Sequence, residues 1–248
     1  MMKILHIHLF KNAGTSLINF FEKQIGKSYC LDLEHELGKF NVFVEKDELM
    51  QCAEKYPEKL FFTAHNIEPI FDSKFLNLMP LRNPISRAIS VYEYEIYQGK
   101  NGAQNPGPKK AISSNPDDYF KWRLKKNKNG VICNFHISSI IGLRLCRSRI
   151  LKKSDIDFAK DKYNKYFFNF IVEEFDKYIE RLSNKLEKNG FKPIPQTSIG
   201  KFNSLGGNFN PKEAEKKLKD LLTKKTFEEF KERNIADLEF YNHFKENG

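Results

Sequence analysis

Residues 4–21 constrain the fold most, because they predict a buried strand, a short turn and an amphipathic helix in immediate succession. The turn contains Lys11 and Gly14, and the helix then begins with Thr15 and Ser16. A helix N-terminus presents unpaired N–H groups and a partial positive charge, to which a lysine and two hydroxyls add further donors. Glycine lets the backbone approach a ligand closely. The sequence therefore predicts an α/β protein with an anion site at this turn.

The turn differs from the phosphate-binding loop of ATPases. That loop has the pattern G-x-x-x-x-G-K-[ST], in which a lysine directly follows the last glycine. Here Thr15 follows Gly14, and Lys11 precedes the glycine by three positions. We therefore expect the anion to be held differently from the β- and γ-phosphates of ATP.

A second segment, at residues 80–94, has the same strand-to-helix character. Arg82 follows an apolar run of strand length at residues 76–81, and Pro84 suits the first turn of a helix, where its missing N–H costs nothing. Ser90 then lies about two turns into that helix. Ligands of open α/β sheets bind where strands end, and an arginine fork suits a terminal phosphate.

The two segments together resemble the PAPS-dependent sulfotransferases, most closely the carbohydrate 2-O-sulfotransferase branch (the heparan sulfate type). That branch has a P-K-T-A-x-T-S loop and an R-D-P-x-x-R-x-x-S segment. The resemblance implies a P-loop-like three-layer fold, with a central, mostly parallel sheet flanked by helices. It also implies that 3′-phosphoadenosine 5′-phosphosulfate (PAPS) is the co-substrate. The 5′-phosphosulfate would be bound by Lys11, Asn12, Ala13, Gly14, Thr15 and Ser16, and the 3′-phosphate by Arg82 and Ser90.

Three positions depart from the family pattern. Phe10 replaces a proline, Asn12 a threonine and Asn83 an aspartate. None of these changes removes the lysine, the arginine or the serine. The charge arrangement is therefore retained, whereas the geometry of the loops is left open.

His65 is the candidate catalytic base. It follows an apolar run at residues 60–64, and the resemblance implies that a histidine after this strand takes the proton of the acceptor hydroxyl. A base is needed because a sugar hydroxyl is a poor nucleophile near neutral pH, where an ordinary histidine is available to accept a proton. The family often has two histidines here, but Thr63 stands at the first position. Lys11 would stabilise charge on the leaving phosphate, and the scheme requires no metal.

Other residues are weaker candidates for the acceptor and nucleotide sites. His6 and His8 alternate on one strand and so face the same side, but two histidines without a third ligand do not indicate a metal site. We expect His8 to lie near the substrate, and His136 to contact the acceptor. Lys201 and Asn203 lie in a stretch rich in Gly, Ser and Asn, which either closes over the nucleotide or is a flexible surface connection.

The composition agrees with one domain spanning residues 1–248. The net charge of +10 suits a substrate with two phosphate groups, and because the basic residues are scattered we expect no nucleic-acid partner. Since no charged-then-apolar signal pattern and no run of about 18 apolar residues is found, we expect a cytoplasmic protein without a membrane span, with a trimmed ectodomain as the open alternative. We expect the four cysteines to be free thiols, because their spacing matches no metal site.

The remaining elements follow from apolar periodicity and turn residues. We expect strands at 40–45 and 167–172, and a long loop at 99–116, which holds three prolines and three glycines. Helices are expected at 46–56, 117–126, 133–141, 154–166, 175–188, 211–223 and 227–244.

The sequence thus favours a sulfotransferase that acts on a hydroxyl, with a saccharide or glycolipid as acceptor and a homo-oligomer as an open alternative to a monomer. The second interpretation is a P-loop-type nucleotide or small-molecule kinase, although the Walker lysine is missing. The third is a non-catalytic anion or nucleotide binder, which would tolerate the loss of His65.

Overall fold

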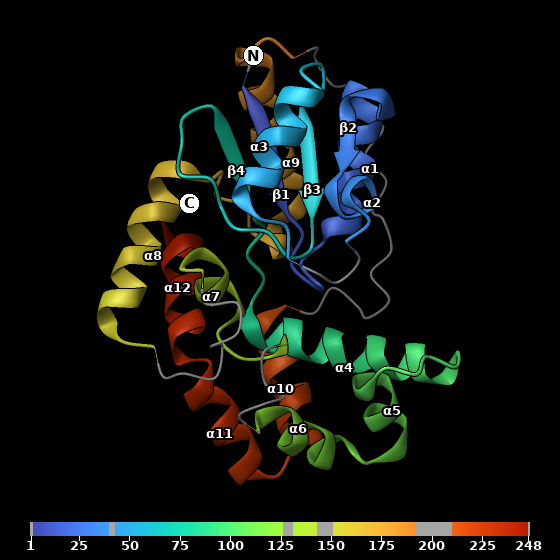
Figure 1. Cartoon of the computed structure of the whole chain (residues 1–248). Helices are drawn as coiled ribbons and strands as arrows, with labels where there is room; N and C mark the ends of the chain where they lie inside the picture. Colours follow the sequence, from blue (N-terminus) through green and yellow to red (C-terminus); the bar gives the residue numbers. More distant parts are fainter. Residues whose placement is uncertain (1, 40–42, 126–130, 143–150, 192–209, 248) are drawn as a thin grey trace. The chain divides into compact units, whose positions relative to one another are not determined.

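The computed structural model describes residues 2–39, 43–125, 131–142, 151–191 and 210–247 (Figure 1). The chain divides into two compact units. The first comprises Met1–Leu81 with Ala159–Phe202, and the second Arg82–Phe158 with Asn203–Gly248. The single domain expected from the sequence stays a prediction.

A four-stranded parallel sheet forms the centre of the first unit. Its strands are β1 (Lys3–Ile7), β2 (Cys30–Asp32), β3 (Phe61–Ala64) and β4 (Phe75–Leu78), in the order β2-β3-β1-β4. The register pairs Ile4 with Phe61 on one side of β1 and with Leu76 on the other. The strands expected at 60–64 and 76–81 are thereby confirmed in position, although β4 ends three residues earlier.

Burial on both faces explains why these strands appear in the sequence as unbroken apolar runs. All four residues of β3 and all four of β4 are buried. In β1 the residues Ile4, Leu5 and Ile7 are at most 1% exposed. A sheet of this kind needs a layer of helices on each face, and the first unit supplies both.

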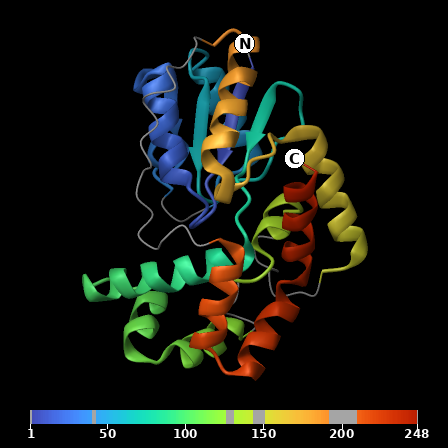
Figure 2. The ribbon, with the colours of Figure 1, turned by 180° about the vertical axis from the view of Figure 1, so that it is seen from behind.

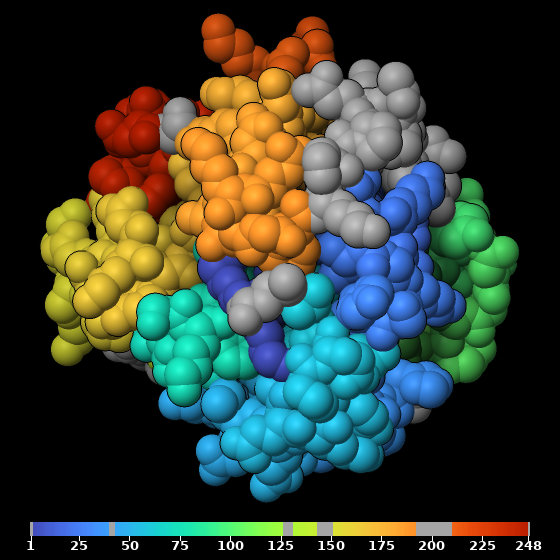
Figure 3. All heavy atoms as spheres, turned by 90° about the horizontal axis from the view of Figure 1, so that it is seen from above, coloured from blue at the N-terminus to red at the C-terminus, as the bar shows by residue number. Residues whose placement is uncertain are grey.

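Helix α3 (Lys46–Lys55) covers the near face of the sheet in Figure 1. Helix α9 (Phe175–Lys188) covers the opposite face, with α1 (Gly14–Ile25) beside it in Figure 2. Figure 3 looks along the strands and shows the start of β1 between the orange α9 and the cyan α3. The expected α/β class, with a central parallel sheet flanked by helices, is confirmed.

The short elements of this unit complete the connections. These are the 3₁₀ turns η1 (Lys27–Tyr29) and η3 (Val172–Glu174) and helix α2 (Leu33–Leu37). The strand expected at 167–172 is present only as two parallel bridges, which join Phe167 to Asn77 and Ile171 to Leu81. Of the strand expected at 40–45, residues 40–42 lie outside the described residues, and Val44 forms a single bridge to Ile67.

The described part of the second unit is helical. Its helices are α4 (Pro84–Lys100), α5 (Pro106–Ser113), α6 (Pro116–Leu124), α7 (Phe135–Ile140), α10 (Pro211–Leu221), α11 (Lys224–Arg233) and α12 (Ile235–Glu246). Within the unit, α4 packs against α5 and α10, α6 against α11, and α7 against α12. Helix α8 (Lys153–Tyr166) crosses the division between the units, because the first segment of the second unit ends at Phe158.

The prediction of a long loop at 99–116 is wrong, because this stretch contains α5. Pro106 occupies the first turn of this helix, a position that proline tolerates. Gly107 is a packing residue rather than a turn residue. A Cβ built there would lie 2.2 Å from the guanidinium of Arg123 and 2.3 Å from the carboxylate of Glu95, which form a buried ion pair.

The prediction of a single helix at 227–244 is also wrong, since Asn234 separates α11 from α12. The side chain of Asn234 donates to the carbonyl of Phe230 (3.0 Å) and accepts from the backbone N–H of Asn134 (3.2 Å). These bonds satisfy a fully buried amide at the end of α11. A side chain that bonds to backbone groups in this way competes with a continuous helix.

Candidate functional site

The turn between β1 and α1 has an unusual backbone. Lys11 (φ 64°) and Ala13 (φ 60°) both adopt the left-handed conformation, which costs a residue other than glycine about 1 to 2 kcal/mol. Turns of this kind can aim successive N–H groups into one concavity that accepts an anion. The cost would be offset if the turn serves a ligand, and it identifies this segment as the best anion-site candidate of the first unit.

The N-terminus of α1 lies next to this turn. Ala13 is the N-cap residue, and its own side chain makes no capping hydrogen bond. The carbonyl of Ala13 accepts the first helical hydrogen bond, from Leu17 (3.1 Å). Thr15 is exposed and Ser16 is half-buried, so the hydroxyls that we predicted as donors lie at the start of the helix. Helix N-termini are suited to anions.

Asn12 anchors the turn. Its side-chain amide donates to the carbonyl of Pro80 over 2.7 Å, and its backbone N–H donates to the carbonyl of Leu9 over 3.1 Å. The residue is 1% exposed. These bonds join the turn to the segment that follows β4 within the same unit. They give Asn12 a structural role, and the contact with the nucleotide that we expected stays a prediction.

Gly14 is needed for a reason that the sequence did not reveal. A Cβ built at Gly14 would lie 1.8 Å from Cδ2 and 2.0 Å from Nε2 of His8. The imidazole of His8 therefore rests directly on the first residue of α1. Only a residue without a side chain permits this approach.

Two further histidine rings stack with His8. The centroid of the His65 ring lies 4.0 Å from that of His8, and the centroid of the His6 ring lies 5.2 Å from it. The stacking then continues into the core through Phe61 (5.6 Å from His6) and Phe21 (4.2 Å from Phe61). The structure thus brings together two of the predicted residues, His8 and His65, and places them beside the start of α1.

Burial determines the charge state of the inner histidines. Burial first, and then the neighbouring His65, lowers the pKa of His8 to about 3. Burial, with His8 and His65 nearby, also lowers the pKa of His6 well below the usual range. Both rings are therefore neutral near pH 7. His6 bonds through Nδ1 to the hydroxyl of Thr63 (2.9 Å), the residue that stands where the family has its first histidine.

His65 is the accessible one of the three histidines. Its side chain is 48% exposed, whereas His6 is fully buried. The Nδ1 atom of His65 lies 3.1 Å from Oε2 of Glu34, a residue on α2 that sequence reasoning missed. Since Nδ1 is occupied by the carboxylate, Nε2 is the nitrogen left to meet an acceptor. The predicted base is therefore available, and it lies one stacked ring away from the start of α1.

In the second unit, the helix that follows Arg82 begins as predicted. The side chain of Asn83 accepts from the backbone N–H groups of Ile85 (3.0 Å) and Ser86 (3.2 Å), and Pro84 occupies the first turn of α4. Asn83 thus performs the capping role for which aspartate also serves. The departure from the family pattern at this position leaves the start of the helix intact.

Arg82 and Ser90 are both buried, at 6% and 2% exposure. Among the described residues, the hydroxyl of Ser90 has no hydrogen-bond partner. Buried hydroxyls are normally bonded, so an orphaned one on the helix that follows Arg82 is consistent with a site for an added ligand. That one ligand binds both these residues and the turn before α1 stays a prediction.

His136 lies at the start of α7 and is fully buried. Its Nδ1 is 3.1 Å from Oδ2 of Asp237, and its Nε2 accepts from the backbone N–H of Arg82 over 3.4 Å. Asp237 also accepts from the backbone N–H groups of His136 and Ile137 (2.9 and 3.0 Å). This arrangement favours a role in positioning the backbone of Arg82 over the acceptor contact that we expected for His136.

Some predicted features lie elsewhere. Lys201, Asn203 and Cys146 fall outside the described residues. Cys30, Cys52 and Cys133 are free thiols. In the described ranges, no group of three or more His, Cys, Asp or Glu side chains could hold a metal ion.

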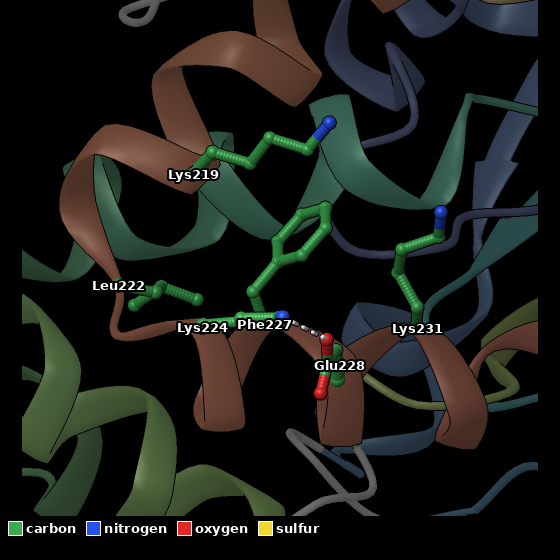
Figure 4. A pocket seen from close by; sticks show the side chains of 6 residues that line it. All are labelled: Lys219, Leu222, Lys224, Phe227, Glu228 and Lys231. Carbon is green, nitrogen blue, oxygen red and sulfur yellow. Dashed lines mark ion pairs between the residues drawn. The ribbon is translucent and has the colours of Figure 1, made fainter.

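A hollow of about 530 Å³ lies between α10 and α11 of the second unit, away in sequence from every predicted site residue. Figure 4 shows the Phe227 ring with Lys219 and Lys231 on either side of it; their amines lie 5.4 and 5.6 Å from its centre. Both lysines pair with Glu215, at 3.0 and 3.8 Å. The single carboxylate of Glu215 therefore offsets one of the two positive charges.

Comparison with known proteins adds little about function. No family model matches the chain. The chain is similar to an uncharacterized protein of Archaeoglobus fulgidus, with 25% identity over 194 residues that cover 75% of this chain and 73% of that protein. Among the helices that the structure describes, none is long and apolar enough to cross a membrane.

Proposed function

We propose that the protein is a sulfotransferase, which moves a sulfuryl group from PAPS to a hydroxyl group of a saccharide or glycolipid. One observation carries the proposal. A half-exposed histidine, His65, stacks on His8, and His8 rests on Gly14 at the start of α1. A candidate base and a candidate anion site therefore share one edge of the parallel sheet, where ligands of α/β proteins commonly bind.

The proposed chemistry assigns a distinct role to each group. The oxygen of the acceptor hydroxyl attacks sulfur, and the bond between sulfur and the bridging phosphate oxygen breaks. The products are a sulfate ester and adenosine 3′,5′-bisphosphate. The hydroxyl proton passes to Nε2 of His65, while Lys11 and the N–H groups at the start of α1 stabilise charge on the leaving phosphate. Positioning and charge supply most of the catalysis in such in-line transfers.

The residues of the second unit would bind the 3′-phosphate. Arg82 offers a fork of donors that matches a phosphate, and the buried Ser90 hydroxyl adds one more. In support, Asn83 fixes the start of α4, and His136 fixes the backbone N–H of Arg82. The roles of Arg82 and His65 can be tested separately, because a variant of Arg82 should weaken nucleotide binding without altering the base.

The test is transfer of sulfate from PAPS to a set of p-nitrophenyl glycosides. The wild-type protein should release adenosine 3′,5′-bisphosphate in the presence of an acceptor. The variant His65→Ala should lose about 10²- to 10⁴-fold in kcat, the range that a general base supplies, and keep its affinity for the bisphosphate. His35→Ala is the matched control, because His35 is an exposed histidine on α2. Equal turnover by wild type and His65→Ala would refute the base role.

A further inference from the structure

Glu34 holds both the backbone and the ring of His65. Its Oε1 accepts from the backbone N–H of His65 over 3.0 Å, and its Oε2 lies 3.1 Å from the ring Nδ1. Glu34 is 7% exposed, whereas the side chain of His65 is 48% exposed. A buried carboxylate thus uses each of its oxygens on one accessible histidine. An exposed, mobile ion pair would not show this double contact.

The local sequence explains how the carboxylate reaches this position. Asp32 ends β2 and caps the short helix α2, since its side chain accepts from the backbone N–H groups of Glu34 (3.0 Å) and His35 (3.2 Å). Asp32 pairs in register with Thr63 of the neighbouring strand β3, two residues before His65. The cap therefore turns Glu34 toward the end of β3 and leaves His35 exposed.

The opposite side of the His65 ring is occupied by His8. The two rings stack with an interplanar angle of 26°, and His8 is itself held between Gly14 and His6. Among the described residues, the titratable groups that the structure relates to His65 are Glu34 on α2, with His8 and His6 from the β1 segment. Glu34 is the only one of these that carries a negative charge.

We infer that Glu34 is the positioning residue for the proposed base, fixing His65 as the Nδ1–H tautomer with Nε2 directed to the acceptor. The inference rests on the proposed function for its role in turnover, but the tautomer itself follows from the contacts. A carboxylate accepts and cannot donate when ionised, so the proton between the two groups belongs to Nδ1. The second nitrogen then carries the lone pair that takes the hydroxyl proton. The same carboxylate stabilises the imidazolium that forms as the acceptor attacks.

The tautomer can be measured without any sulfate transfer. In protein labelled with ¹⁵N at histidine, the two ring nitrogens of each imidazole have distinct shifts at a pH of about 8, well above the ordinary histidine range. The variant His65→Ala assigns the signals. We expect the Nδ1–H tautomer for His65 in the wild type and a majority of Nε2–H in Glu34→Ala. A wild-type Nε2–H tautomer, or an unchanged Nδ1–H tautomer in Glu34→Ala, would overturn the inference.

Glu34→Gln keeps the shape of the side chain and serves if Glu34→Ala does not fold. The amide has one acceptor oxygen in place of two, so it cannot give each N–H its own oxygen. We expect a mixture of tautomers in this variant. The matched control is Glu36→Gln on the same helix, because Glu36 bonds to Lys55 and Tyr56 instead of to a histidine. A change of the His65 tautomer in Glu36→Gln equal to that in Glu34→Gln would contradict a specific role for Glu34.

Turnover supplies the second readout. If His65 is the base, Glu34→Ala should lower kcat by about 100-fold, the order expected when a reacting group is displaced by about 1 Å, and leave the Kd for adenosine 3′,5′-bisphosphate within about twofold. Loss of bisphosphate affinity together with kcat would instead indicate collapse of the turn, and would refute a positioning role. A protein that shows the expected tautomer but no sulfate transfer would retain the Glu34–His65 contact and refute the proposed function alone.

Discussion

The substitution Gly14→Ala tests the contact on which the site depends. The new Cβ would lie 1.8 Å from Cδ2 of His8, whereas ordinary contacts begin near 3.4 Å, so the ring must retreat by about 1.6 Å. The ring has little room, because it stacks with both His65 and His6. Overpacking of this kind costs about 1 to 3 kcal/mol.

Two effects therefore oppose each other in Gly14→Ala. Alanine in place of glycine favours a helix by about 0.5 to 1 kcal/mol, which offsets part of the overpacking. We expect a net loss of about 1 to 2 kcal/mol in the free energy of unfolding. For a chain of this length, that loss lowers Tm by about 2 to 8 °C.

A double-mutant cycle with His8→Ala isolates the contact. In the His8→Ala background the alanine at position 14 has space, and Gly14→Ala should be neutral or stabilising by up to about 1 kcal/mol. Urea unfolding of the four proteins gives the coupling energy, which we expect to exceed about 1 kcal/mol. A cost of Gly14→Ala that is the same with and without the imidazole would refute the claim that His8 rests on Gly14.

Three further variants test the surroundings of the site. Arg123→Met removes the cationic partner of the buried Glu95 carboxylate, which keeps the Tyr119 hydroxyl as a donor (2.6 Å), and should cost about 3 to 5 kcal/mol by urea unfolding; a cost below about 1 kcal/mol would contradict a desolvated pair. Asn12→Ala removes the 2.7 Å bond to the carbonyl of Pro80 and should cost about 1 to 3 kcal/mol, with none expected if the turn is held elsewhere. Burial raises the pKa of the Asp237 carboxyl, but its histidine partner and backbone hydrogen bonds together bring it below 3.8. Its stabilisation is thus present above about pH 4 and lost as the pH falls further, and the stability gap between wild type and Asp237→Asn should shrink between about pH 5 and pH 3.

Local patterns in the sequence were enough to predict much of the fold. The apolar runs of β1 and β3 and the amphipathic stripe of α1 indicate a buried sheet edged by helices, and the structure confirms this class. Asn83 and Pro84 mark the start of α4 because capping and proline placement depend only on neighbouring backbone groups. Each of these features is decided within a few residues along the chain.

The features that were missed depend on contacts between distant residues. Glu34 and His65 lie 31 positions apart, and no spacing in the sequence indicates that α2 delivers a carboxylate to the end of β3. Gly107 lies in a stretch rich in proline and glycine that suggests a loop, yet its role is to let α5 approach a buried ion pair. Gly14 was predicted to admit an anion, and the structure shows that it also admits the ring of His8. In each case the role of the residue depends on a tertiary contact that the local sequence does not indicate.

The central claim is that the turn before α1 and the Arg82 segment bind a nucleotide with phosphates at the 3′ and 5′ positions. Calorimetric titration of adenosine 3′,5′-bisphosphate, in the presence of EDTA, tests this most directly. We expect saturable binding that is weakened in Arg82→Ala and in Lys11→Ala, and that exceeds the binding of ATP with Mg²⁺ in a parallel titration. Binding of ATP only in the presence of Mg²⁺, with none of the bisphosphate, would contradict the account and favour a kinase.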